Sequence, residues 1–224
     1  MNICMIPARK GSERLRKKNY LKIGNFTVLE IAILKAIKSG VFDKIIVNTD
    51  DPSLEKTTSK LDIDIYIRDP HLASSDATSD QVVLDFFQNH DQADTVTWVN
   101  TASPLQTIGD IKNFSKITKN KSWKSGVSTN LSRVHTFYKD EPLNFNWGNG
   151  FAKTQDLSPI VQFNYAMMGW NRECCKHLLN GQLFDSNTTL VESSNWSSFL
   201  LKDENDLALI SLLSKVAPDQ GIIF

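Results

Sequence analysis

The sequence predicts a three-layer α/β fold with a mainly parallel sheet. Short apolar runs alternate with amphipathic segments of helical period over the first 120 residues. Turn and capping residues separate these runs, as Gly40 and the pair Asp51-Pro52 do. Strands that alternate with helices of this length form βαβ units, whose strands pair in parallel. With 224 residues the chain fits one large domain, residues 1–224.

The elements follow from the period of the apolar residues. Four strands are expected, at Asn2–Pro7, Lys44–Asn48, Asp62–Arg68 and Thr95–Asn100. Five helices are expected, at Thr27–Ser39, 51–61, Ser79–Asn89, Thr107–Lys119 and Asp206–Lys215. The first helix is expected to bury Val28, Ile31, Ala32, Leu34 and Ile37, and the third Val82, Val83, Phe86 and Phe87. Gly40 suits the end of the first helix, and Asp51 before Pro52 suits a helix start.

The regular alternation ends at about Ser132. Residues 133–162 are rich in Asn, Gly and Pro and contain five aromatic side chains: Phe137, Tyr138, Phe145, Trp147 and Phe151. A flexible linker does not carry so many large apolar side chains. The composition therefore predicts short antiparallel strands or a hairpin arm.

Composition limits the class of protein. The chain carries 25 basic and 25 acidic side chains, so its formal net charge is zero. This balance argues against nucleic acid or a membrane surface as a general partner. The three cysteines lack metal-ligand spacing and are typical of reduced thiols, and no signal peptide or apolar run of about 18 residues is present. We therefore expect a soluble cytoplasmic protein.

A basic loop follows the first expected strand. Arg and Lys are dense between Arg9 and Lys18, beside a Gly11-Ser12 turn. Exposed backbone N–H groups and clustered cations suit several phosphate charges. A solvated surface loop is the alternative, since basic runs are common. Its position at the carboxyl end of a strand favours a ligand site.

The same stretch resembles the first motif of the acylneuraminate (CMP-sialic acid synthetase-like) cytidylyltransferases, I-P-A-R-x-G-S-K-R-x-P-x-K-N. Matching positions are Ile6, Pro7, Ala8, Arg9, Gly11, Ser12, Arg14, Lys18 and Asn19. Glu13 stands where Lys is usual, and Arg16 where Pro is usual. The resemblance implies a Rossmann-like nucleotidyltransferase sheet with a small dimerisation arm at about 132–162. It also implies a homodimer that transfers CMP from CTP to an acidic sugar, with Mg²⁺ as cofactor and release of pyrophosphate.

The resemblance assigns roles around the nucleotide. Arg9, Arg14 and Lys18 are expected as the catalytic cations that neutralise the triphosphate. Nucleotide-binding residues are expected at Ala8, Arg9, Gly11, Ser12, Asn19, Asp50, Arg68 and Asp76. Two alternatives stay open: Asp51 reads mainly as a helix cap, and Arg68 also fits a surface ion pair. A one-residue insertion after Arg68 leaves either Ser75 or Asp76 at the family's acidic position.

The acceptor side departs further from the family pattern. Expected acceptor-binding residues are Asn100, Thr101, Ser103, Gln106 and Asn164. Gln106 replaces the usual Arg, which leaves the identity of the acid open. The family's metal positions fall on Leu200 and Lys202, and Lys does not ligate Mg²⁺. Asp203 becomes the expected ligand after a one-residue shift, and it is equally suited to capping the last helix.

Two alternatives to a sialic acid cytidylyltransferase remain. The acceptor could be another nonulosonic acid, a 3-deoxy-octulosonate or a phosphonate. The chain could also be a nucleotide-binding paralogue without turnover, because Leu200 and Lys202 occupy the metal positions. Release of pyrophosphate from CTP across a panel of sugar acids separates these readings.

Overall fold

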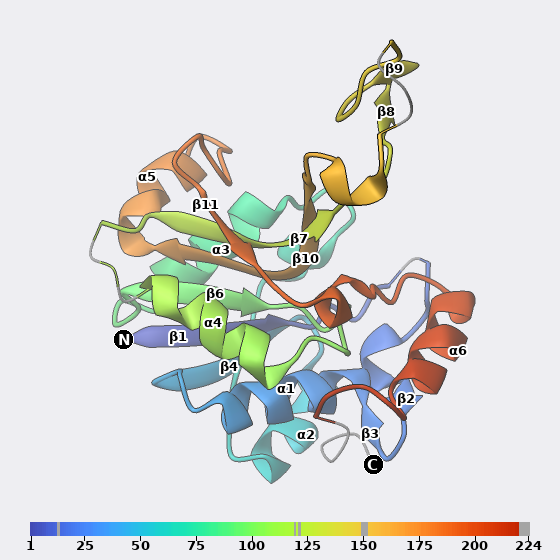
Figure 1. Ribbon diagram of the computed structural model, residues 1–224. Coiled ribbons are helices and arrows are strands. Elements are labelled where there is room, and N and C mark those ends of the chain that lie inside the picture. Colours follow the sequence, from blue (N-terminus) through green and yellow to red (C-terminus); the bar gives the residue numbers. More distant parts are fainter. Residues whose placement is uncertain (13, 119, 121, 149–151, 220–224) are drawn as a thin grey trace.

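The computed structural model describes residues 1–12, 14–118, 120, 122–148 and 152–219. A seven-stranded sheet with the order β11-β7-β10-β6-β1-β4-β5 forms its centre (Figure 1). The strands are β1 Asn2–Pro7, β4 Lys44–Thr49, β5 Asp64–Ile67, β6 Thr95–Val99, β7 Ser125–Ser132, β10 Ile160–Asn171 and β11 Thr189–Glu192. Neighbouring strands pair in parallel except at β10, which runs antiparallel to both β6 and β7. The predicted mainly parallel sheet is confirmed.

Helices cover both faces of the sheet. The helices are α1 Val28–Ser39, α2 Glu55–Lys60, α3 Ser79–Gln88, α4 Ile108–Thr118, α5 Cys175–Leu178 and α6 Glu204–Leu213. One core cluster joins α1 and α4 to the sheet, and a second joins α3 and α5 to its other face. A third cluster packs α6 against the short hairpin of β2 (Lys22–Ile23) and β3 (Phe26–Thr27). Within the described ranges, no helix is both long and apolar enough to span a bilayer.

The predicted helix ends are explained by their caps. Thr27 accepts the Glu30 N–H while Glu30 accepts the Thr27 N–H, which is a reciprocal capping box. Gly40 ends α1 with φ of 63°, a left-handed conformation that glycine adopts without strain. The Asp51 carboxylate accepts the Ser53 N–H, so the capping role expected for Asp51 is confirmed. Lys119, the expected last residue of the fourth helix, lies outside the described residues.

The strands β7 and β11 and the helix α5 were not predicted from the sequence. The β7 strand reads SGVSTNLS, and its small polar residues lack the β-branched run that predicts a buried strand. It is nevertheless buried over its first five residues, between β10 and β11. Gly126 and Gly169 lie on this part of the sheet, where an added Cβ would meet Ile117 and Trp123 side chains within 3.2 Å. Close packing, not strand propensity, explains these residues.

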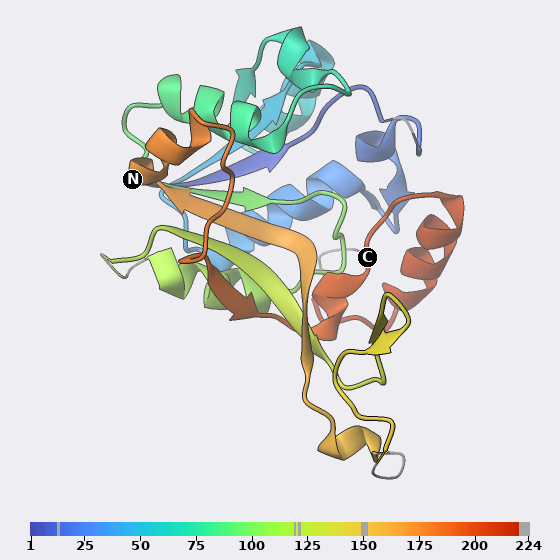
Figure 2. The same ribbon diagram turned by 90° about the horizontal axis from the view of Figure 1, so that it is seen from above.

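The predicted arm is a projection from the sheet. The long strands β7 and β10 carry it outwards (Figure 2), and β8 (Phe137–Tyr138) pairs with β9 (Glu141–Pro142) near the tip seen in Figure 1. Phe145 lies edge-on to Phe137 and Trp147, with ring centroids 5.2 Å and 5.6 Å apart. The expected hairpin is confirmed, and three aromatic side chains among the described residues of the arm are exposed: Phe137, Tyr138 and Trp147.

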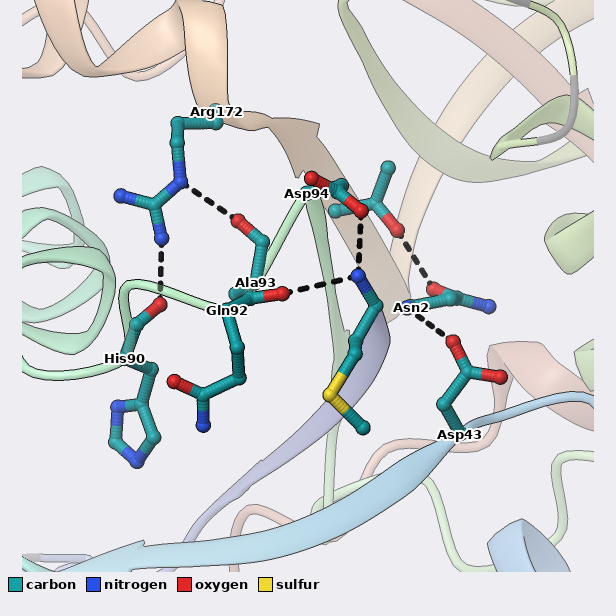
Figure 3. A network of polar contacts seen from close by, with 9 residues as sticks. Asn2, Asp43, His90, Gln92, Ala93, Asp94 and Arg172 are labelled. Atoms are coloured by element: carbon teal, nitrogen blue, oxygen red, sulfur yellow. Dashed lines mark hydrogen bonds and ion pairs between the residues drawn. The ribbon is translucent and has the colours of Figure 1, made fainter.

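The amino ends of the strands form a polar edge (Figure 3). The amino group of Met1 donates to the Gln92 carbonyl at 2.9 Å and pairs with Asp94. Arg172, directly after β10, donates through Nε to the Ala93 carbonyl at 2.7 Å. These bonds join β1 and β10 to the turn before β6 without leaving the guanidinium free. This edge is structural, and the parallel strands β1, β4, β5 and β6 end at the opposite one.

One buried lysine corrects the expected face of α1. Ile37 is 39% exposed, whereas Lys35 is fully buried. The Lys35 Nζ donates to the carbonyls of Pro104 and Gln106 at 2.9 Å and 2.7 Å. A cation therefore fixes the loop after β6 to α1, which apolar periodicity alone does not reveal. Burial lowers the pKa of Lys35 to about 8, against the opposing effect of the Asp219 and Asp110 carboxylates.

This pKa predicts a pH-dependent contribution to stability. Below pH 8 Lys35 is charged in both states, so the full cost of burying the charge is present. Between about pH 8 and 10.5 the unfolded chain binds more protons, so the free energy of unfolding rises with pH. Between these pH values the free energy of unfolding of the wild type should rise by at most about 3 kcal/mol more than that of Lys35→Met. Urea unfolding at pH 7.5, 9 and 10.5 measures it, and parallel profiles would contradict it.

Candidate active site

A cavity of about 340 Å³ opens at the carboxyl edge of the sheet. Its walls come from the loop after β1, the β5–α3 connection, the end of β6 and the segment 201–202. Open parallel sheets bind ligands at this edge, because the loops there are free to diverge while the strands stay fixed. The cavity thus lies where the basic loop was expected to bind its ligand.

Three cations of the basic loop meet in the cavity. Arg9, Arg14 and Lys18 all line it, together with Ser12. The pKa of Lys18 is lowered, first by burial and then by repulsion from Arg14 and Arg9. Like charges held this close destabilise the free protein unless an anion joins them. The wall is therefore suited to a ligand that carries several negative charges.

The basic loop is held in place by side chains beneath it. Asn19 is 6% exposed and donates to the Arg9 carbonyl at 3.1 Å. It accepts the Thr101 hydroxyl at 3.0 Å, which ties the loop after β1 to the loop after β6. The Tyr20 hydroxyl donates to the Asp51 carboxylate at 2.6 Å. These bonds orient the cations before any ligand arrives.

A second wall contains polar groups that lack partners. Arg68 is only 4% exposed, and its Nη1 is 3.4 Å from the Asn48 side-chain oxygen. Among the described residues, no partner is found for the buried Arg68 Nε, Ser74 Oγ or Trp98 Nε1. All three side chains line the same cavity. A buried unpaired polar group costs about 1–3 kcal/mol, so a ligand with matching acceptors would recover this free energy.

The first turn of α3 completes this wall. Thr78 and Ser79 line the cavity, and Thr78 forms a capping box with Gln81. Free N–H groups and the helix dipole favour an anion at such an end. Pro7, Leu72 and Val82 add apolar surface. Cations, free donors and an apolar patch together suit a nucleotide.

Comparison with known proteins agrees with this geometry. A family model described as cytidylyltransferase matches residues 3–166. The chain belongs to the cytidylyltransferase family. The match covers β1, the basic loop, both cavity walls and the arm, but it ends before the segment 201–202.

Relatives and solved structures extend the comparison. An N-acylneuraminate cytidylyltransferase of Streptococcus agalactiae serotype V is 29% identical over 194 residues, 83% of this chain and 46% of the relative. The chain thus spans about half the length of that protein. The post-translational flagellin modification protein B of Campylobacter coli is 24% identical over 95% of this chain and 94% of its own length. The structure of a CMP:2-keto-3-deoxy-manno-octonic acid synthetase complexed with CTP superposes with a TM-score of 0.70 at 13% identity, over 96% and 98% of the chains, which shows a shared fold.

The structure brings together eight of the residues expected in the site of this cytidylyltransferase-family chain. They are Arg9, Ser12, Arg14, Lys18, Asn19, Arg68, Asn100 and Thr101. The burial of Arg68 and its place in the cavity argue against the alternative of a surface ion pair. Asn100 accepts the Ala102 N–H and donates to the Tyr165 carbonyl, so its orientation is fixed from both sides.

Four expected nucleotide-binding residues lie outside the cavity lining. Ala8 is buried, and its carbonyl accepts the Thr49 hydroxyl at 2.6 Å. Asp50 accepts the Lys10 N–H at 2.8 Å and so shapes the basic loop. Asp76 is exposed, as is Ser75, and a Cβ added at Gly11 would meet no atom within 4 Å. In this structure Ala8 and Asp50 support the site from behind it.

Three expected acceptor-binding residues are engaged inside the protein. The Ser103 hydroxyl donates to the Ser197 carbonyl at 2.8 Å, and the Gln106 amide to the Asn100 carbonyl at 3.3 Å. Asn164 accepts the Ser128 hydroxyl at 2.6 Å. None of the three lines the cavity, because each is buried and bonded to a neighbouring loop or strand. In this structure they hold the loop after β6 and the bulged strand β10, and their contact with an acceptor stays a prediction.

The expected metal ligand Asp203 is the N-cap of α6. Its carboxylate accepts the Asp206 N–H at 3.0 Å, and the Asp206 carboxylate accepts the Asp203 N–H at 3.2 Å. Asp203 does not line the cavity, whereas Lys202 does. No group of three His, Cys, Asp or Glu suited to a metal occurs in the part of the chain that the structure describes. The geometry assigns Asp203 to the cap.

Sequence reasoning missed several cavity residues. Ser74, Thr78 and Ser79 follow Arg68 in the connection to α3, and their small polar side chains gave no pattern beyond a turn. Trp98 lies inside β6 and reads as a core residue. The Trp98 indole and the N-terminal turn of α3 can be recognised as parts of the cavity only in the folded structure, where the strand ends meet at one edge.

Proposed function

We propose that this chain transfers CMP from CTP to an acidic sugar and releases pyrophosphate. The observation that carries the proposal is the convergence of Arg9, Arg14 and Lys18 on a cavity that also holds the unpaired Arg68 and Trp98 donors. The family match over residues 3–166 supports the cytidylyl group. The names of the streptococcal relatives support an N-acylneuraminate-type acceptor.

The residues support a reaction by positioning and charge neutralisation. An acceptor oxygen attacks the α-phosphorus of CTP in line, the bond to the bridging oxygen breaks, and pyrophosphate leaves with the electron pair. Arg9, Arg14 and Lys18 would bind the triphosphate and the leaving pyrophosphate. Asn19 would keep the basic loop in register, since it bonds both the Arg9 carbonyl and Thr101. The N-terminus of α3 would bind a further anionic oxygen.

The unpaired donors suit the base. Arg68 Nε and Trp98 Nε1 are directional N–H donors in a buried wall. The cytosine carbonyl and ring nitrogen are acceptors of matching kind. We therefore assign this wall to the nucleobase and the loop after β6, with Asn100 and Thr101, to the acceptor side. A 3-deoxy-octulosonate or a phosphonate is the alternative acceptor, and binding without turnover is the alternative function.

Mg²⁺ is proposed to reach the cavity on CTP. Mg²⁺ prefers hard oxygen ligands and is often held by one or two carboxylates together with substrate phosphates. Asp203 does not fit such a site, because its carboxylate caps α6 and lies outside the cavity lining. The phosphate oxygens of CTP are the ligands that remain for the ion.

Arg9→Ala should weaken CTP binding by about 1–3 kcal/mol, as expected for a lost charge-assisted contact. Calorimetric titration with CTP measures the effect. Arg16→Ala is the matched control, because Arg16 belongs to the same loop, is exposed and does not line the cavity. Equal affinity of the Arg9 variant and wild type would refute the assignment of the triphosphate site.

Asp203→Asn should be nearly silent, because Asn caps a helix about as well as Asp. We expect the same free energy of unfolding and the same Mg²⁺ dependence of pyrophosphate release from CTP and N-acylneuraminate as in the wild type. A metal ligand would behave differently: kcat and kcat/KM would fall together. Such a fall without loss of stability would restore Asp203 to the metal.

We also propose a homodimer formed through the arm. Five large apolar side chains of the arm are more than half exposed: Val134, Phe137, Tyr138, Leu143 and Trp147. Clustered exposed aromatics are typical of an interaction surface. The partner proposed for the arm is a second copy of this chain, because the arm extends directly from two strands of the main sheet.

Light scattering at micromolar concentration should give about twice the 25.3 kDa mass of the chain. Trp147→Ser should shift the species towards the monomer, because it removes the most exposed aromatic among the described residues of the arm. Leu179→Ser is the control, since Leu179 is 66% exposed but lies at the end of α5. A monomeric wild type would contradict the proposal.

A further inference from the structure

Lys202 is fixed at the wall of the cavity by its neighbours. Leu201 is fully buried in the cluster under α6, and its N–H bonds the Ala102 carbonyl at 2.7 Å. The Lys202 N–H itself bonds the Asp206 carboxylate at 2.8 Å. Both sides of the residue are thus anchored, one to the loop after β6 and the other to α6. Lys202 is exposed and lines the cavity, so its side chain can reach a ligand there.

The Lys202 ammonium is available for a ligand. Within the described residues its Nζ makes no ion pair or hydrogen bond, although three carboxylates are close in sequence, those of Asp203, Glu204 and Asp206. The Asp203 and Asp206 carboxylates are held in the reciprocal capping box of α6. The cap therefore directs two of the three nearby carboxylates towards backbone N–H groups, and none of the three forms an ion pair with the ammonium.

Lys202 is the fifth cation of the cavity. The other four are Arg9, Arg14, Lys18 and Arg68, and every charged side chain among the described lining residues is basic. These cations reach the cavity from three separate segments: the loop after β1, the end of β5 and the segment before α6. Cations that converge from distant segments without carboxylate partners favour a ligand with several negative charges.

We propose that the Lys202 ammonium binds phosphate oxygens of the nucleotide and supplies, from the protein itself, positive charge that a carboxylate-held Mg²⁺ would otherwise bring. The inference rests on the proposed function for the identity of the nucleotide. Lysine suits this role because its ammonium is a compact charge with three donors on a flexible stem. A second consequence follows: the chain binds the triphosphate measurably without any divalent cation.

The experiment is calorimetric titration with CTP in EDTA, with no metal present. The wild type should bind, and Lys202→Met should bind about tenfold or more weakly, as expected for a lost charge-assisted contact. Lys202→Arg keeps the charge and should stay within a few fold of the wild type. Lys215→Met is the matched control, because Lys215 is exposed beyond α6 and does not line the cavity.

Titration with tripolyphosphate separates this inference from the proposed function. A wild type that binds tripolyphosphate but not CTP refutes the cytidylyl assignment, and a weaker Lys202→Met then still supports the phosphate contact. Equal affinities of Lys202→Met and wild type for both probes overturn the inference. So does a Lys202→Met variant that binds CTP normally but raises the KM for the acidic sugar, because Lys202 then contacts the acceptor.

Discussion

Repulsion among like charges is the constraint on which the rest of the site depends. Arg9, Arg14 and Lys18 converge at one edge of the sheet, and burial together with repulsion from Arg14 and Arg9 lowers the pKa of Lys18. A free loop would relieve this repulsion by spreading into solvent. Here hydrogen bonds prevent it: Asn19 ties the loop to Thr101, and the Asp50 carboxylate accepts the Lys10 N–H. The fold thus fixes the orientation of the three cations before any ligand binds, and this arrangement favours a polyanion.

The supporting structure under the site is also polar. Lys35 holds the loop after β6 through two carbonyls, and Asp110 accepts hydrogen bonds from Ser194 and Ser197. These groups are buried and paired, so each is costly to remove and each fixes one geometry. Asn100 and Thr101 depend on that geometry, because they lie at the start of the same loop. A wholly apolar core would hold the loop with less angular precision.

The carboxylates near the site stabilise the fold. Asp51 caps the turn after β4, Asp110 holds the connection before α6, and Asp203 with Asp206 caps α6. Each carboxylate accepts backbone N–H or hydroxyl groups and so is not directed at the cavity. Basic side chains therefore set the potential inside the cavity. This division between acidic supports and basic lining explains why a neutral chain presents a strongly cationic site.

The sequence by itself determined the alternation of strands and helices, the helix end at Gly40, the cap at Asp51, the hairpin arm and the basic loop. These are local features, because periodicity, capping and turn chemistry act within a few residues. Only the tertiary structure decided which groups face the cavity. The fold buries Lys35 in a helix face that the sequence pattern predicts to be apolar. It engages Ser103, Gln106 and Asn164 in hydrogen bonds inside the protein. It also brings Trp98 and Lys202 to the cavity at the carboxyl edge of the sheet. Most of those outcomes depend on contacts between residues far apart in the sequence, such as Lys35 with Pro104 and Ser103 with Ser197, which no local pattern records.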